Sequence, residues 1–157
     1  MNVSSQRPNA LPGFVFPVLC FTKDGDIWGV ADEFELTTCG PRTLARGVQE
    51  GMELVDAAGQ CWQVKSIRQV GYAPFSWRSF WLFQPRLSII EHEFEPMTAL
   101  SLEETQVRIC KALDSHYEYW CSEAERTTRL LEMISEVRGA RSIAEIHDVL
   151  GLDYFGD

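Results

Sequence analysis

Histidine and cysteine are the residues of this sequence whose side chains could most directly carry out chemistry. A zinc site usually takes two ligands that are close in the sequence, such as two His four residues apart on a helix or a Cys-x-x-Cys pair. The three histidines, His92, His116 and His147, are too widely spaced for this, and no two of the five cysteines form such a pair. No phosphate-binding glycine loop occurs either. The sequence therefore predicts neither a metal site nor a cofactor.

Cys39 is the best candidate for a nucleophile. It precedes Gly40 and Pro41, just ahead of a short helix predicted at residues 43–49, and a helix N-terminus lowers the pKa of a thiol. A catalytic cysteine also needs a histidine and an orienting Asn or Asp nearby in space. No local signature supplies them, and an ordinary turn cysteine is the simpler interpretation. A small enzyme that uses Cys39, or a buried carboxylate with a histidine, is therefore an alternative function.

Acidic side chains dominate the charge of the chain. The net charge is −9, and residues 101–157 hold twelve acids and six bases. Proteins that grip phosphate backbones carry clustered Lys and Arg, so this balance argues against nucleic acid and against an anionic membrane. It permits a basic protein partner, because an acidic surface steers basic surfaces toward it. The candidate recognition residues on the helices are Asp114, Glu118, Glu132 and Glu136.

The N-terminal part of the chain is predicted to form antiparallel strands. Apolar and β-branched runs flank Asp24 and Gly25, and a second pair of runs flanks Ala57 and Gly59. Asp-Gly between two such runs is a strong hairpin signal, because the turn needs residues that tolerate positive φ. Pro17 has no N–H to donate, so the first strand is predicted to be an edge strand or to be bulged there.

Residues 90–95 alternate in polarity. Ile90, His92 and Phe94 should face one way, and Glu91, Glu93 and Glu95 should face the other way. This pattern is typical of a strand with one packed face and one solvated face. We therefore interpret the three glutamates as solvated strand residues and not as a pair of catalytic carboxylates.

After residue 100 the apolar residues recur with the period of a helix. The predicted apolar stripes are Val107, Cys110, Leu113, Tyr117 and Trp120 in the first helix, Leu130, Leu131, Ile134 and Val137 in the second, and Ile143, Ile146, Val149 and Leu150 in the third. Ser101, Ser122 and Ser142 each precede a glutamate by three residues, which is the spacing of a capping box at a helix start. Gly139 and Gly151 stand where the second and third helices should end. Residues 101–139 could also form one long helix. The sequence predicts an α+β fold: a twisted, mostly antiparallel sheet of four to six strands, followed by about three helices packed on one face.

The predicted organisation is one domain over residues 14–157, preceded by a flexible tail at 1–13. Residues 14–95 should form the sheet-rich part and residues 101–150 the helical part. The N-terminus lacks a secretory pattern, the cysteines are odd in number, and no apolar run approaches ~20 residues. These features predict a reduced, cytoplasmic protein with no membrane span.

Aromatic residues concentrate at 75–83, the stretch FSWRSFWLF. A strand that is apolar on both faces is typical of the middle of a sheet, and this is our interpretation. Its more polar first half leaves Trp77 and Arg78 as candidates for contact with a partner. Tyr154 and Phe155, near the C-terminus, are two further candidates. A dimer interface built on this strand would make the protein a structural or oligomerisation module, which is a second alternative.

Three stretches in order resemble small uncharacterised bacterial proteins, some of which occur in toxin–immunity neighbourhoods. The stretches are the DGD turn at 24–26, then DEFELTTCGPRTLARG, then GMELVDAAGQCWQV. The resemblance covers roughly residues 14–64, and its residues are mostly turn and core types. It implies a small, cytosolic and acidic immunity-type protein that binds and occludes a toxin. We therefore expect a non-enzymatic binding protein whose acidic surface recognises a basic toxin domain.

Overall fold

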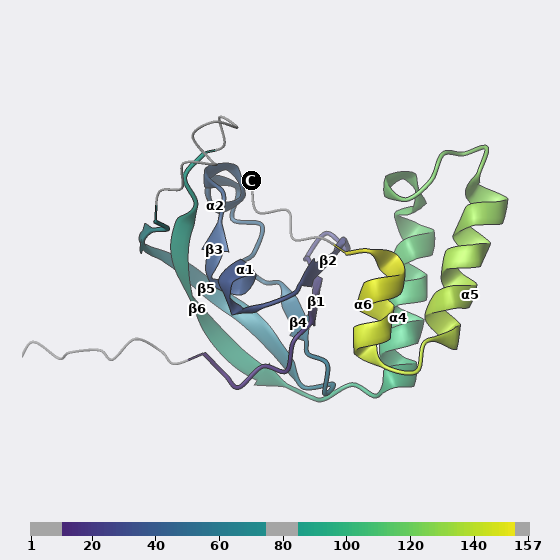
Figure 1. The fold of residues 1–157 in the computed structure, drawn as a ribbon, viewed down its shortest axis with the longest axis horizontal. Coiled ribbons are helices and arrows are strands. Elements are labelled where there is room, and N and C mark those ends of the chain that lie inside the picture. The colour runs from purple at the N-terminus through teal and green to yellow at the C-terminus, as the bar shows by residue number, and fades with distance from the viewer. Residues whose placement is uncertain (1–10, 75–84, 153–157) are drawn as a thin grey trace, which may run out of the picture.

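The computed structural model describes residues 11–74 and 85–152 of the chain. Its core is a curled antiparallel sheet of six strands, and the C-terminal helices pack at one end of that sheet (Figure 1). This confirms the predicted α+β class, the number of strands and the packing of the helices on one face. The strands are β1 (Val18–Phe21), β2 (Ile27–Val30), β3 (Thr38–Cys39), β4 (Glu53–Val55), β5 (Cys61–Tyr72) and β6 (Ser88–Met97).

The order of the strands across the sheet is β2-β1-β4-β5-β6-β3, and each neighbouring pair is antiparallel. The Asp-Gly signal marks the β1–β2 hairpin correctly. Phe21 pairs with Ile27, and Gly25 takes a φ of +93° in the turn between them. A residue with a side chain would be strained in that conformation.

The β4–β5 hairpin is also where the sequence predicts it, and Asp56 holds it together. The Asp56 side chain is almost fully buried and accepts hydrogen bonds from the backbone N–H groups of Ala58 and Gln60, both at 2.9 Å. It also accepts one from Val15 at 3.0 Å, which ties the segment before β1 to this turn. Three N–H groups that would otherwise lack partners are thus satisfied by one carboxylate.

The prediction that the first strand is an edge strand or is bulged is wrong. β1 lies between β2 and β4, and it begins at Val18, one residue after Pro17. The missing N–H of Pro17 therefore lies outside the ladder and removes no strand hydrogen bond. All four β1 residues are buried because both faces of this strand are covered.

One side of the sheet packs on the helices and the other faces the inside of the curl. Leu19, Phe21 and Val55 contribute to the core shared with the helices. Val18 and Leu54, their neighbours in sequence, contribute to a second core on the opposite face. The alternation of β1 and β4 thus builds two cores from two short strands.

β5 and β6 form a long ribbon on which the predicted alternation is confirmed. Ile90 and His92 are buried, whereas Glu93 and Glu95 are exposed. Register shifts between Val64 and Ser66 and between Gln69 and Gly71 mark bulges in β5.

Two short helices connect the strands on the side of the sheet away from the C-terminal helices: α1 (Glu33–Thr37) and α2 (Pro41–Arg46). α1 is not predicted from the sequence, although Asp32 caps it by accepting a hydrogen bond from Glu35 N at 3.0 Å. α2 ends at Arg46, before the expected Gln49, because Gly47 takes a left-handed conformation there.

The helical part contains two separate helices where the sequence allows one long helix. Ser101 forms the complete predicted capping box with Glu104, and Ser142 caps its helix as expected. Ser122 does not cap a helix, because its own N–H and hydroxyl both donate to the Glu125 carboxylate. The segments are α4 (Leu102–Ser115), the short 3-10 helix η1 (Tyr117–Tyr119), the π-helical turn η2 (Arg126–Leu130), α5 (Leu131–Gly139) and α6 (Ile143–Leu150).

Two contacts fix α4 against its neighbours. The Gln106 side chain donates to the carbonyls of Val137 and Ala140 at the end of α5, at 3.1 and 2.9 Å. On the other side, the Arg108 guanidinium lies 4.0 Å from the centre of the Phe21 ring and pairs with Glu53. α6 lies between the sheet and the outer helix α5 (Figure 1).

Candidate partner-binding site

A groove runs between α5 and α6 and brings two of the predicted acidic residues together. Its volume is about 290 Å³. Both Glu132 and Glu136 lie on its rim, one helical turn apart, and both are exposed. The remaining lining residues, which complete what we call the α5–α6 groove, are Trp120, Arg129, Met133, Val149 and Leu150.

The α5–α6 groove combines an apolar floor with an acidic rim. Met133 and Trp120 are half-buried, and Val149 is 36% exposed although its place in the apolar stripe predicts an inward position. Arg129 adds one base to the rim. Such a surface suits a partner that brings an apolar side chain flanked by Lys or Arg.

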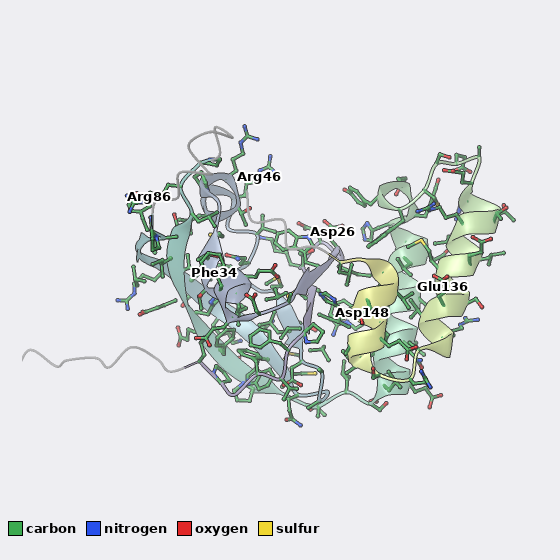
Figure 2. All side chains as sticks on the ribbon, in the orientation of Figure 1. Asp26, Phe34, Arg46, Arg86, Glu136 and Asp148 are labelled. Carbon is green, nitrogen blue, oxygen red and sulfur yellow. The ribbon has the colours of Figure 1, made fainter. Side chains whose placement is uncertain are left out.

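The two acids share this rim with Arg129 but are not paired with it. Glu132 and Glu136 take part in no ion pair or hydrogen bond among the residues that the structure describes. Like charges four residues apart on a helix repel each other by a few tenths of a kcal/mol. Figure 2 shows Glu136 on α5 and Asp148 on α6 at this end of the molecule.

The other two predicted acids on the helices lie elsewhere. Asp114 lines a second groove, between α4 and α5, where its carboxylate lies 4.0 Å from the Arg126 guanidinium. Glu118 is exposed on η1. The predicted acidic residues therefore do not form one continuous stripe, because α5 separates the two grooves. Trp77, Arg78, Tyr154 and Phe155 lie outside the described residues, as does the predicted central strand at 75–83.

Cys39, the candidate nucleophile, is fully buried at the end of β3. Burial raises the pKa of its thiol, and this effect opposes the expected influence of the helix start that follows it. The structure therefore gives no support to a thiolate nucleophile at this position. The other four cysteines are also buried and free, as expected for small apolar residues.

His92 is buried on β6 and stacks on Phe94, with ring centres 5.1 Å apart. Neither of its ring nitrogens has a hydrogen-bond partner within residues 11–74 and 85–152. Burial lowers its pKa to about 4, so the ring is neutral at pH 7. A buried, neutral histidine that packs on a neighbouring ring is typical of a core position.

The described part of the chain contains no group of three or more His, Cys, Asp or Glu side chains placed to hold a metal ion. None of the described helices has the length and apolar character needed to cross a bilayer.

Comparisons with protein-family models, with curated proteins and with solved structures find no match to this chain. The resemblance of residues 14–64 to immunity-type proteins accordingly stays a prediction. The residues that sequence reasoning missed are the groove-floor residues Trp120, Met133 and Val149. For Trp120 and Val149 the sequence did contain a signal: both belong to the predicted apolar stripes, whose residues are expected to pack where helices meet.

Proposed function

We propose that this protein is a non-enzymatic binding protein that recognises a basic protein partner through the α5–α6 groove. The observation that carries the proposal is the pair of exposed, unneutralised carboxylates of Glu132 and Glu136 above an apolar floor. A basic partner would relieve their mutual repulsion and would cover the apolar side chains at the same time. The net charge of −9 would speed the encounter.

Within this proposal, the partner is a basic toxin domain and the protein is an immunity-type inhibitor. The resemblance over residues 14–64 and the acidic helical part support this choice. The mechanism would be occlusion: electrostatic attraction brings the toxin to the groove, and a few buried apolar contacts determine how slowly it leaves. No chemical step is required of the inhibitor.

The test is a pull-down from the native host, followed by titration of each captured basic protein against matched charge variants. The double variant Glu132→Gln, Glu136→Gln should weaken binding by about tenfold or more, because two charges near the contact are lost. The control, Glu93→Gln with Glu95→Gln, removes the same charge from the β6 strand and should change the affinity by no more than about twofold.

Equal losses in both double variants would mean that the overall charge, and not the groove, governs binding. Unchanged affinity in the groove variant would place the contact elsewhere. To test the toxin assignment, the captured protein should arrest growth when it is expressed alone and not when this chain is expressed with it. A partner without that effect would contradict the immunity role while leaving the groove proposal standing.

A further inference from the structure

A second cavity, which shares only Trp120 with the α5–α6 groove, lies where the sheet meets the helices. Its volume is about 330 Å³, and three stretches line it: residues 25–28 of the β1–β2 hairpin, residues 112–120 from the end of α4 onward, and residues 151–152 after α6. Figure 1 shows this hairpin next to the C-terminal end of α6. A cavity of this size is at the lower end of the range for small-molecule sites.

The walls of the cavity are set by close backbone packing. A Cβ at Gly25 would lie 2.7 Å from His116 Nε2, and Gly25 also has a positive φ. A Cβ at Gly29 would lie 2.5 Å from His147 Nε2 and 2.6 Å from Leu152 Cβ. The hairpin can approach the helices only because both positions are glycine. The cavity is therefore formed by the close approach of the β1–β2 hairpin to the helices.

The side chains that line the cavity are mainly aromatic and aliphatic, and one of them is a carboxylate. His116, Tyr119 and Trp120 present rings from the helical side, and Ile27 and Leu152 add aliphatic surface. Asp26 contributes the carboxylate; its backbone N–H is bonded to Thr22 Oγ1 at 3.0 Å. The carboxylate itself accepts no hydrogen bond and forms no ion pair within the described residues, and it is partly buried.

Other classes of ligand fit this lining less well. An anion would meet Asp26 and no Lys or Arg, because no base is among the lining residues. A metal ion would find one carboxylate and one imidazole, short of the ligand number that a protein site needs. A neutral apolar molecule would cover Asp26 without pairing its charge, which is unfavourable.

We propose that this cavity binds a small organic ammonium ion. Its positive nitrogen would lie among the rings of Tyr119 and Trp120, with the Asp26 carboxylate as counter-ion, and its alkyl or aryl groups would contact Ile27 and Leu152. Aromatic faces attract cations, most strongly where water is excluded, and this is how proteins recognise quaternary ammonium groups. The site does not depend on the partner proposed above, although Trp120 contributes to both surfaces.

The test uses choline and its uncharged isostere 3,3-dimethylbutan-1-ol as probes of the full chain at low salt. Binding is followed by two-dimensional ¹H–¹⁵N NMR, in which the indole N–H of Trp120, assigned with Trp120→Phe, reports directly on the cavity. We expect saturable shifts at Trp120 and at the Gly25 and Gly151 amides. Choline should bind about tenfold more tightly than the isostere.

Two variants separate the site from the general field of an acidic protein. Asp26→Asn should weaken choline binding by about tenfold and remove most of the preference over the isostere. Asp24→Asn removes the same charge two residues away, at an exposed position outside the lining, and should change the affinity by about twofold or less. Tyr119→Leu replaces a ring that is 75% exposed, so the fold should persist while choline affinity falls several-fold.

Three results would overturn the proposal: no saturable shift at Trp120, equal affinity for choline and its isostere, or equal losses in the Asp24 and Asp26 variants. Dispersed NMR spectra of each variant confirm that a lost signal reflects lost binding and not unfolding.

Discussion

The acidic residues of the β5–β6 ribbon and those of α5 have the same chemistry and opposite surroundings. On the ribbon, the Glu91 carboxylate pairs with Arg68 at 2.6 Å, Glu93 accepts a hydrogen bond from Ser66 at 2.9 Å, and Glu95 pairs with Lys65. On α5, Glu132 and Glu136 face the groove with no such partner within the described residues.

This difference shows that the number of acidic residues in a segment does not indicate where a partner would bind. Cross-strand bases neutralise Glu91 and Glu95, and the Ser66 hydroxyl bonds to Glu93, so these acids help to hold the two strands together. The α5 acids leave their charge available to another molecule. The net charge of the sequence is the same whichever acids are paired, and only the arrangement of the strands and helices distinguishes the two groups.

The largest expected effect is a loss of stability on the sheet side of the molecule, caused by replacing Asp56 in the β4–β5 hairpin. Asp56→Ala removes the buried carboxylate that accepts from the N–H groups of Val15, Ala58 and Gln60, and we expect the free energy of unfolding to fall by about 3–5 kcal/mol. Asp56→Asn can keep the two bonds made by one oxygen and lose only the bond to Val15, so its loss should be intermediate. Urea denaturation measures both, and a loss below about 1 kcal/mol in the alanine variant would contradict this account.

The next effect depends on pH and comes from His92. The ordinary pKa of histidine is about 6.5, and in the folded protein burial lowers the pKa of His92 to about 4. Between these values the unfolded chain binds a proton that the folded chain does not, so stability falls as the pH falls from 6.5 to 4. The full loss is about 3 kcal/mol.

His92→Leu should remove this contribution, because leucine cannot be protonated. It should also stabilise the protein at pH 7 by about 1–3 kcal/mol, since two unpartnered ring nitrogens leave the core. Denaturation curves at several pH values between 7 and 4.5 test both statements. Parallel pH dependences of the variant and the parent protein would show that His92 is not buried as described.

The smallest effect compares the two groups of acids directly. Glu91→Gln loses the ion pair with Arg68 on the ribbon and should lower the stability by about 0.5 kcal/mol. Glu136→Gln relieves repulsion with Glu132 and should leave the stability unchanged or raise it by a few tenths of a kcal/mol. Thermal unfolding at low salt and at 1 M salt measures the difference, which should shrink as salt screens both charges. The reverse order would mean that the α5 acids have a structural role.

Local patterns predicted the two hairpin turns, the starts of α4 and α6, and the buried face of β6. Gly25 and Gly59 marked the turns because few other residues adopt positive φ, and Ser101 marked a helix because its hydroxyl satisfies a backbone N–H. The inward position of His92 followed from simple alternation. The same local rules misplaced Val107 and Leu131, which belong to predicted apolar stripes and are 65% and 60% exposed.

The sequence by itself determined the class of fold, the two hairpins, the acidic balance and the presence of separate apolar and polar faces. These follow from periodicity and turn chemistry, which act over a few residues. Only the tertiary structure decided that β1 is an interior strand, that the Cys39 thiol is buried, which acids are neutralised, and where the groove and the cavity lie. Those features depend on which segments, distant in the sequence, pack against each other. The burial of a side chain and the pairing of its charge are set by these surrounding residues and not by the residue type alone.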